Sequence, residues 1–347
     1  MMKTVTVSVL GAAGFVGGEL IRLLQGHRHV QLVDVTSRAR AGQPIGRTIP
    51  SLRHFPETGR KRFVAMESMQ PVDIVFSCLP GGALPGMLEQ IRGKARRIIN
   101  LAGDFRLRDP ELVAKHYPQT AALGMPADAR YLIPEFWQAE YADAPLLNLP
   151  GCMAIATFYS LYPLVARGLV ESDIVAEAKT GSSGSGKESA EHPAERGHNY
   201  RPYKLSGHRH EPEIVEALAE HAGQRVDLRF SAGSLDSPRG ISVSSFFTLR
   251  EGVQELDVRK AFMSAYGNTR FIRYLGPAQG PWNMPMLKTV VGSNAVEIAT
   301  DTVGRRCTVV SALDNLIKGA AGQAIQAMNL AEGFDEAEGL AYGGMWP

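Results

Sequence analysis

The stretch KTVTVSVLGAAGFVGGELIRLLQGH, residues 3–27, constrains the fold of this chain more than any other part of it. A strand-like apolar run leads into Gly11, Gly14 and Gly17, and an amphipathic helical pattern follows at once. Glycines in such a turn let the backbone approach a pyrophosphate, which then lies at the positive end of the helix. The spacing is GxxGxxG rather than GxGxxG, but the strand before it and the helix after it favour a dinucleotide site over a purely structural turn. We expect six residues to contact the dinucleotide: Gly11, Ala13, Gly14, Phe15, Val16 and Gly17.

The second strand-like run, VQLVDVTSRARAG, indicates which dinucleotide is bound. A site for NAD usually ends this strand with an acid that binds the ribose 2′-hydroxyl. Here the run ends in Ser37, Arg38 and Arg40, whose hydroxyl and guanidinium groups suit a 2′-phosphate. Asp34 is expected to point elsewhere. The sequence therefore favours NADPH over NADH, and the alternative for the two arginines is a solvated loop.

Strand and helix patterns keep alternating after this point. Residues 72–91 read as strand, loop and helix, and residues 95–107 read as a further strand with a polar exit. Such alternation predicts a parallel, doubly wound α/β sheet, a Rossmann domain, which binds ligands beyond the carboxyl ends of its strands. The motifs CLPGG and LAGDFR would lie at that edge, so we expect Pro80 to contact the cofactor and Arg106 the substrate. The alternative for Asp104 and Arg106 is a surface ion pair.

The second half of the chain predicts a different sheet. Residues 173–180, 229–250 and 305–313 are β-rich and suggest a more antiparallel, mixed arrangement. Residues 314–334 predict one long amphipathic helix that returns to the nucleotide domain. A chain of 347 residues is too long for one core. We therefore predict three parts: an NADP-binding domain over residues 1–149, a catalytic and dimerisation domain over residues 150–313, and a C-terminal segment over residues 314–347.

Composition excludes several classes of partner. The formal net charge of +2 gives no broad electrostatic footprint for nucleic acid or for an anionic membrane. No apolar run of about 18 residues or more is present, so no transmembrane helix is expected. The N-terminal run passes directly into the glycine turn and lacks the cleavage site of a signal peptide. We expect a cytoplasmic protein.

A long polar stretch, residues 181–214, is too rich in Gly, Ser and His to be ordinary core. Its start, GSSGSGKE, nearly matches a phosphate-binding P-loop, but Glu188 stands where a Ser or Thr hydroxyl would bind Mg²⁺. A glycine-rich substrate loop is the better interpretation, with Ser183 at the substrate and Gly184 at the cofactor. Further along the chain, in SPRGI, Arg239 is a candidate for holding an anionic substrate.

The end of this stretch, GHRHEPEI, contains His208, His210 and Glu213. In an extended segment the two histidines share one side, and Glu213 would orient His210 if a helix begins near Glu211. Two histidines and a carboxylate can bind a metal, but no third histidine or cysteine lies at ligand spacing, so no metal is expected. An acid–base partner for a nucleophile fits better, and a pair of surface histidines is the alternative.

Cys152 is the candidate nucleophile among three cysteines, whose wide spacing indicates neither a disulfide framework nor a zinc site. Cys78 and Cys307 lie in strand-like apolar runs. Cys152 follows Pro-Gly and opens the run CMAIATFYSLYPLV, so it would lie at a helix N-terminus. There the helix dipole lowers the pKa of a thiol, and backbone amides can hold an oxyanion. The thiolate would attack an activated carbonyl and give a thioester that hydride reduces to an aldehyde; a small buried residue is the alternative.

Taken in chain order, nine motifs carry a resemblance to a known family: GAAGFVGGEL, TSRARAG, LAGDFRL, IPEF, PGC, GSSGSGKE, GHRHEPEI, PRGI and DNLIKGAAGQAIQAMN. Over its whole length the chain resembles the N-acetyl-γ-glutamyl-phosphate reductases and their relatives that act on carrier-protein-linked aminoadipyl or glutamyl phosphate. The resemblance implies NADPH-dependent reductive dephosphorylation of an acyl phosphate to a semialdehyde. It also implies a Rossmann domain joined to an α/β domain that forms dimers or tetramers.

The resemblance further implies residue roles. Cys152 matches the nucleophile of PGC, and His210 matches the acid–base group of HRH, with Glu213 in support. The division of labour between His208 and His210 stays open. The glycine turn matches the pyrophosphate site, and the segment 37–40 matches the adenosine-phosphate site. Two residues match the C-terminal segment near the nicotinamide: Asn315 and Lys318.

The substrate is open between two classes. Acetylglutamyl enzymes typically read PGCYPTA where this chain reads PGCMAIA, and even the carrier-linked relatives usually have Thr where Ile155 stands. The stretch EHPAERGHNYRPYKLSGHRH looks more like the relatives whose substrate is held on a small acidic carrier protein. We favour carrier-linked aminoadipyl or glutamyl phosphate, with Arg196, Arg201 and Lys204 meeting the acidic tail of the carrier. N-acetyl-γ-glutamyl phosphate, as in arginine biosynthesis, with a simple basic loop, is the alternative.

Two rival functions fit the motifs less well. A catalytically inactive NADP-binding sensor would have lost the thiol or the histidine pair, and both are present. A semialdehyde dehydrogenase of the aspartate type uses the same thiol chemistry, but GHRHEPEI and DNLIKGAAGQA argue against it.

Overall fold

The computed structural model describes residues 3–187 and 192–346, so Glu188 of the P-loop-like motif lies outside the described residues. The chain divides into two compact units. The first unit comprises residues 1–150 and 320–341, and the second comprises residues 151–319 and 342–347.

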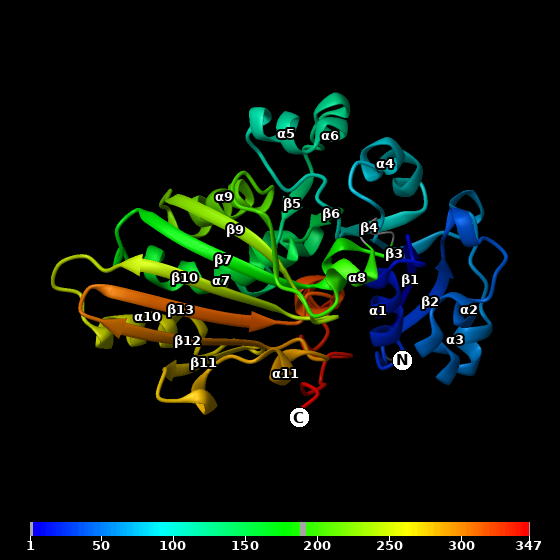
Figure 1. Ribbon diagram of the computed structural model, residues 1–347. Helices are drawn as coiled ribbons and strands as arrows, with labels where there is room; N and C mark the ends of the chain where they lie inside the picture. The colour runs from blue at the N-terminus through cyan, green and yellow to red at the C-terminus, as the bar shows by residue number, and fades with distance from the viewer. Residues whose placement is uncertain (1–2, 188–191, 347) are drawn as a thin grey trace. The chain divides into compact units, whose positions relative to one another are not determined.

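The first unit is built on a six-stranded sheet of order β2-β1-β3-β4-β6-β5, in which all neighbouring strands are parallel (Figure 1). The predicted Rossmann domain is confirmed. The chain passes from β2 to the far side of β1, so the carboxyl ends of β1 and β3 form the switch point where such sheets bind ligands. The strands are β1 (Val5–Leu10), β2 (Val30–Val35), β3 (Val72–Ser77), β4 (Ala95–Asn100), β5 (Ala129–Tyr131) and β6 (Leu146–Asn148).

Helices separate most of these strands in the predicted alternation, whereas short 3₁₀ turns connect β5 to β6. The runs of Val, Ile and Leu in β1, β3 and β4 are almost wholly buried, as expected for parallel strands that are covered on both faces. The helices of this unit are α1 (Phe15–Leu24), α2 (Ile45–Thr48), α3 (Pro56–Arg60), α4 (Leu84–Arg92), α5 (Pro110–His116), α6 (Pro118–Leu123) and α12 (Gly322–Glu332).

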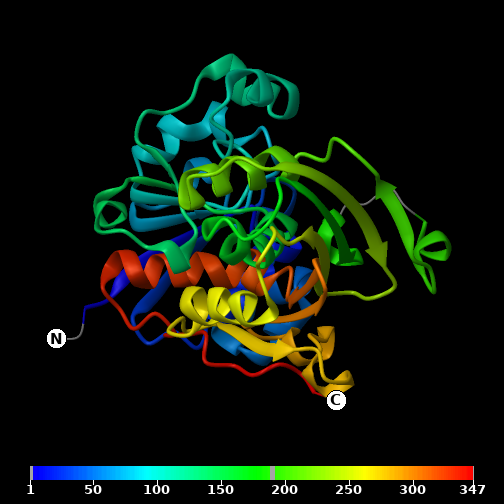
Figure 2. The same cartoon turned by 90° about the vertical axis from the view of Figure 1, so that its left-hand side faces the viewer.

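The prediction of one amphipathic helix over residues 314–334 is wrong in two respects. The segment begins with a π-helical turn, Ile317–Ala321, before α12, the red helix of Figure 2. In addition, α12 is not amphipathic, because every residue from Gly322 to Asn329 is buried. The many Ala and Gly residues have small side chains, which lets α1 and the short turns at 134–136 and 139–143 pack closely around the helix.

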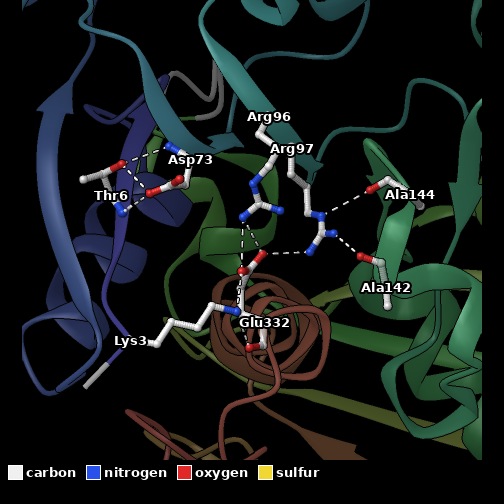
Figure 3. A network of polar contacts seen from close by, with 8 residues as sticks. All are labelled: Lys3, Thr6, Asp73, Arg96, Arg97, Ala142, Ala144 and Glu332. Atoms are coloured by element: carbon white, nitrogen blue, oxygen red, sulfur yellow. Dashed lines mark hydrogen bonds and ion pairs between the residues drawn. The ribbon is translucent and has the colours of Figure 1, made fainter. Parts of the chain in front are cut away.

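Glu332 ties the end of α12 to the edge of the sheet (Figure 3). Its carboxylate lies 2.9 Å from Arg97 and 3.0 Å from Arg96, both on β4, and 3.1 Å from Lys3. Arg97 also donates to two backbone carbonyls between β5 and β6. The side chains of Arg97 and Glu332 are each only 3% exposed, so this is a buried ion pair with further hydrogen bonds.

The second unit contains a seven-stranded mixed sheet of order β11-β12-β13-β10-β7-β9-β8. The central strand β10 is antiparallel to β7 and β13, whereas β7 and β9 are parallel to each other, as are β11 and β12. The predicted mixed sheet is confirmed. Its strands are β7 (Asp173–Gly181), β8 (Arg201–Lys204), β9 (Asp227–Leu235), β10 (Ile241–Thr248), β11 (Ile272–Pro277), β12 (Val296–Val303) and β13 (Arg306–Leu313).

One face of this sheet is covered by helices. In β10 every second residue is buried, and α7 packs against β7, β10 and β13, while α9 packs against β9 (Figure 1). The helices of this unit are α7 (Cys152–Ala166), α8 (Pro193–Arg196), α9 (His210–Ala222), α10 (Glu255–Tyr266) and α11 (Leu287–Val290). Across the described residues, no helix has both the length and the apolar character needed to cross a membrane.

Candidate active site

Cys152 is the first residue of α7, as the sequence predicts. Gly151 is the N-cap, with an extended backbone (φ −68°, ψ 149°), and the chain turns into the helix directly at the cysteine. Cys152 is half-buried, whereas the next nine residues of α7 are all buried. A thiol at this place meets the positive end of a long helix and still has access to solvent, the environment that favours the thiolate.

Glu213 holds the first turn of α7 in place. Its Oε1 accepts a hydrogen bond of 2.7 Å from the backbone N–H of Gly151, and the residue is only 1% exposed. We expected Glu213 to support His210; the contact seen here is with the amide before the cysteine, and the role toward His210 stays a prediction. The contact also brings the GHRHEPEI segment and the PGC motif together, although the two bonded residues are 62 positions apart in the sequence.

His208 and His210 lie side by side and are 9% and 3% exposed, respectively. Their ring centroids are 4.7 Å apart, and Nδ1 of His208 accepts the backbone N–H of His210 at 3.1 Å. A nitrogen that accepts a hydrogen bond carries no proton, so a neutral His208 is the Nε2–H tautomer. Helix α9 begins at His210. His208 therefore supports the start of the helix that carries both His210 and Glu213.

Gly319, in the π-helical turn, lies directly against Cys152. A Cβ added to Gly319 would be 2.7 Å from Cβ of Cys152 and 3.2 Å from its Cα, so no side chain fits there. Asp314 shapes this turn, because its carbonyl accepts the N–H of Gly319 at 2.9 Å and its carboxylate accepts two further backbone N–H groups of the turn. Gly319 was not predicted as a site residue, although an isolated glycine inside a helical pattern is a signal of close packing.

Tyr203, on β8, was also missed. Its hydroxyl lies 3.7 Å from Sδ of Met153, the residue after Cys152, and its ring lies edge-on to His208 with centroids 6.1 Å apart. Burial, followed by the nearby charge of Cys152, raises the pKa of Tyr203 to about 12. The phenol therefore remains an O–H donor next to the cysteine. The only sequence signal was an aromatic residue within a polar stretch.

Several predicted residues meet around the π-helical turn. The side-chain amide of Asn315 accepts the N–H of Gly240 at 2.8 Å and donates to Oγ of Ser183 at 2.9 Å. Arg239 forms an ion pair of 3.4 Å with Asp314. Asp314 and Asn315 thus join two loops: the glycine-rich loop that carries Ser183 and the exposed Gly184, and the PRGI loop.

Lys318, predicted to lie near the nicotinamide, is fully buried. Its ammonium lies 5.6 Å from the ring centroid of Tyr159 and 5.5 Å from that of Phe271, which is cation–π geometry. In this arrangement Lys318 packs the π-helical turn against α7.

The other two cysteines differ from Cys152. Burial raises the pKa of Cys78 to about 12 and that of Cys307 to about 11. Both therefore stay as neutral thiols. Cys307 is a buried strand residue of β13, as predicted, whereas Cys78 follows the last residue of β3 and is half-buried.

In the first unit, the glycine turn has the geometry of a dinucleotide site. Gly11 has φ +69°, a conformation that favours glycine, and an added Cβ would collide with the carbonyl of Cys78. Gly14 is the N-cap of α1, and a Cβ on Gly17 would be 2.6 Å from Cα of Ala12. The turn is therefore tight, and it directs the N-terminus of a ten-residue helix toward the switch point of the sheet.

The residues after β2 are available to a phosphate. Arg38 and Arg40 lie in a short 3₁₀ turn and are exposed, and Ser37 precedes them. The carboxylate of Asp34 instead accepts the backbone N–H of Gln70 at 2.8 Å. This is the arrangement expected of a site that reads a 2′-phosphate rather than a 2′-hydroxyl.

The loop after β4 is more buried than predicted. Pro80 is exposed, but Arg106 is 7% exposed and donates to the carbonyl of Leu101 at 2.7 Å. Asp104 is fully buried and accepts the N–H of Gly82 at 2.8 Å. The alternative of a surface ion pair at Asp104 and Arg106 is therefore excluded, because both side chains are buried and hold the loops at the carboxyl edge of the sheet.

The basic residues near β8 separate into two kinds. Lys204 is exposed and Arg201 is half-buried, both on the edge strand of the sheet. Arg196 instead turns back onto its own loop, where it donates to the carbonyl of Ser182 at 2.9 Å and to Oγ of Ser185 at 2.7 Å. Among the described residues, no group of three or more His, Cys, Asp and Glu is arranged to hold a metal ion.

Two family models match the chain. The model described as the semialdehyde dehydrogenase NAD binding domain matches residues 6–144, and the model described as the semialdehyde dehydrogenase dimerisation domain matches residues 152–315. The chain belongs to the semialdehyde dehydrogenase family. It is accordingly an enzyme, an NADP-dependent oxidoreductase, and the resemblance drawn from the sequence motifs is confirmed.

Relatives within the semialdehyde dehydrogenase family match over nearly the whole chain. N-acetyl-gamma-glutamyl-phosphate reductase 1 of Lactiplantibacillus plantarum is 39% identical over 344 residues, which cover 98% of this chain and 99% of the relative. A protein of Thermomicrobium roseum, provisionally named a LysW-L-2-aminoadipate 6-phosphate reductase, is 38% identical over 353 residues, 99% of each chain. The two names correspond to the two substrate classes left open by the sequence.

Solved structures of the semialdehyde dehydrogenase family share the fold. Aspartate semialdehyde dehydrogenase II of Vibrio cholerae, solved with ASA, has a TM-score of 0.71 at 15% identity over 94% of this chain and 98% of that chain. Aspartate semialdehyde dehydrogenase of Candida albicans, solved with NADP, has a TM-score of 0.70 at 16% identity over 95% of this chain and 99% of that chain.

Proposed function

We propose that this enzyme reduces an N-blocked acyl phosphate to its semialdehyde with NADPH, through a thioester on Cys152. The observation that carries the proposal is the position of Cys152 as the first residue of α7, with its preceding amide held by the buried carboxylate of Glu213. A half-buried thiol at a helix N-terminus is an activated nucleophile rather than a packing residue.

The chain's own groups supply the steps of acyl transfer. The thiolate of Cys152 attacks the acyl carbon, and the backbone amides at the start of α7 face the oxygen that becomes negative. Collapse of this adduct breaks the bond to phosphate and leaves the thioester. Bound NADPH would supply hydride for the thioester carbon, and Cys152 would then leave as the thiolate when the aldehyde forms. His210, buried beside His208, accepts the proton of the Cys152 thiol and passes it to the departing phosphate. A proton from solvent restores the thiol after the aldehyde forms.

NADPH is preferred over NADH in this proposal. The exposed Arg38 and Arg40 provide two guanidinium groups after β2, and the acid of that strand, Asp34, is engaged with Gln70. Guanidinium groups bind a 2′-phosphate with charge-assisted hydrogen bonds. The glycine turn before α1 provides the site for the pyrophosphate.

For the substrate, we favour an acyl phosphate borne on a small acidic carrier protein, with aminoadipate or glutamate as the acyl chain. Arg201 and Lys204 present positive charge on edge strand β8, the strand that also carries Tyr203 next to the cysteine segment. The name of the Thermomicrobium roseum relative supports this class, and that of the Lactiplantibacillus plantarum relative supports N-acetyl-γ-glutamyl phosphate as the second candidate.

The enzyme acts as a homodimer or homotetramer in this proposal. The face of the seven-stranded sheet opposite α7 carries Phe246, which is 46% exposed. A second copy would bury such a face, and the description of the family model for residues 152–315 as a dimerisation domain supports this.

The test compares two substrates, each generated in place by its kinase: N-acetyl-γ-glutamyl phosphate and carrier-linked aminoadipyl phosphate. NADPH oxidation is followed at fixed enzyme concentration. We expect strong preference for the carrier-linked substrate, loss of that turnover in Cys152→Ala with NADPH binding retained, and normal turnover in Cys307→Ala. Wild-type turnover in Cys152→Ala would overturn the thioester mechanism, and preference for the acetylated substrate would assign the second candidate.

A further inference from the structure

Tyr203 carries a hydroxyl donor close to the cysteine segment. The proposed reaction, as described so far, assigns no role to this hydroxyl. Its O–H lies 3.7 Å from the thioether sulfur of Met153, and Met153 follows Cys152 in the first turn of α7. Its ring lies against that of His208, so the phenol stands between the cysteine segment and the histidine pair. Contacts with two separate segments, the start of α7 and the residues just before α9, therefore fix the position of the Tyr203 side chain.

The hydrogen bond that Tyr203 makes in this structure is a weak one. A thioether sulfur is a poor acceptor, and a carbonyl oxygen that turns into an oxyanion is a much stronger one. If the hydroxyl of Tyr203 leaves the sulfur of Met153 for a carbonyl oxygen of the substrate, its hydrogen bond becomes stronger as negative charge develops on that oxygen. A donor with this property stabilises the transition state more than the ground state.

The location of Tyr203 allows this exchange. Strand β8 is an edge strand of the seven-stranded sheet and, among the described residues, pairs with β9 alone, with an irregular register between Pro202 and Lys204. Tyr203 occupies that irregularity, and the residue is 45% exposed. The ring is thus in contact with the cysteine segment and still open to solvent, so its hydroxyl is free to leave the sulfur of Met153 for a substrate oxygen.

Tyr203 differs in this respect from the neighbouring Tyr200. The hydroxyl of Tyr200 donates to Oε1 of Glu177 at 2.6 Å, on the strand β7. A carboxylate is a strong acceptor, so that phenol is already committed. The two tyrosines are nearly equally exposed, 44% and 45%, and thus form a matched pair in which only one faces the nucleophile.

We propose that the O–H of Tyr203 is a side-chain donor to the acyl oxygen of the substrate, acting with the amides of α7, an inference that rests on the proposed function. When Sγ of Cys152 bonds to the acyl carbon, the π-electrons of the carbonyl move to its oxygen, which accepts the hydrogen bond from Tyr203. The proton stays on the phenol. The electrons return as the bond to phosphate breaks, and the same donor serves the second adduct, formed by hydride addition, until the thiolate leaves.

The experiment measures kcat and KM for Tyr203→Phe with the preferred acyl phosphate. Loss of one oxyanion donor costs about 100- to 1,000-fold in kcat in a dry site. Because Tyr203 is partly exposed, we expect a fall in kcat of about 10- to 100-fold with KM within about threefold of the wild type. Tyr200→Phe and Met153→Leu should keep wild-type kcat, since the first leaves the site intact and the second removes only the weak acceptor.

Alkylation of Cys152 by iodoacetamide separates this role from an effect on the thiol. We expect Tyr203→Phe to keep the wild-type pH profile of alkylation and the wild-type affinity for NADPH. The proposal would be overturned if Tyr203→Phe had the kcat of the wild type or changed KM alone. It would also be overturned if Met153→Leu lost as much kcat, or if a shifted alkylation profile of Tyr203→Phe accounted for the loss of kcat. Absence of acyl-phosphate reduction by the wild-type enzyme would instead overturn the proposed function itself, and Tyr203 with it.

Discussion

Replacement of Glu332 by Gln tests how the C-terminal helix is held in the first unit. Glu332 and Arg97 are each only 3% exposed, and the glutamine side chain would keep the shape of the original while removing its charge. Burial lowers the pKa of Arg97, and the charge of Glu332 is the largest influence that opposes this effect. The substitution therefore leaves a buried guanidinium without its counter-charge (Figure 3).

The magnitude follows from these contacts. Removal of one member of a buried ion pair costs about 3 to 5 kcal/mol. Arg97 keeps its two backbone carbonyl acceptors, so the lower end applies, about 3 kcal/mol. Lys3 and Arg96 are 58% and 51% exposed, so they return to water at little cost. For a unit of this size, about 3 kcal/mol lowers Tm by roughly 6–12 °C.

Urea unfolding followed by Trp137 fluorescence measures this change. Trp137 lies beside the turn that packs on α12, and replacement of the exposed Trp282 and Trp346 by Phe leaves it as the only reporter. Glu338→Gln is the matched control, because its partner Arg28 is 78% exposed and can be solvated again, so only a small change is expected. A loss below about 1 kcal/mol in Glu332→Gln, or an equal loss in the control, would refute the reasoning.

Three further predictions concern the two sites and the pH dependence. Conversion of Arg38 and Arg40 together to Gln should raise the Kd for NADPH by about tenfold in a fluorescence titration, which is the lower end of the effect of charged hydrogen bonds. The Kd for NADH should stay within about twofold of the wild type. An equal loss of affinity for both dinucleotides would contradict a 2′-phosphate site. Gly319→Ala should lower kcat by about 100-fold, because the added Cβ displaces Cys152. Gly343→Ala should keep the wild-type kcat, because a Cβ there meets open space. Equal effects of the two substitutions would show that Gly319 does not position the cysteine. Burial lowers the pKa of His27 below its ordinary 6.5, so the contribution of His27 to stability is present above that pH and is lost as the pH falls toward the lower pKa of the folded state. Between about pH 7.5 and 5.5, the free energy of unfolding of the wild type should therefore fall more than that of His27→Gln. Parallel curves for the two proteins would contradict this prediction.

Local patterns sufficed to predict much of the fold. The glycine turn needs only residues that are neighbours in the sequence, and the alternation of strands and helices in the first unit needs only hydrophobic periodicity. The same holds for Cys152, since Pro-Gly before an apolar run places a cysteine at the start of a helix. Each of these features depends on interactions within about ten residues.

The features that could not be predicted depend on contacts between distant segments. Gly319 is required because Cys152 approaches it across more than 160 residues of sequence, and no local pattern reports that distance. The burial of Asp104 and Arg106 was not predicted, because it arises where separate loops meet at the carboxyl edge of the sheet. Helix α12 read as amphipathic because Gln and Asn look solvent-facing, whereas here they hydrogen-bond inside the unit.

The position of the nucleophile results from two independent supports within the second unit. Glu213 on α9 holds the amide before Cys152, and Gly319 of the π-helical turn limits the space beside it. Neither support is close in sequence to the cysteine. The thiol can therefore be placed accurately only when α9 and the turn after β13 are both folded. This dependence explains why a reactive cysteine needs so large a domain, although its chemistry uses few atoms.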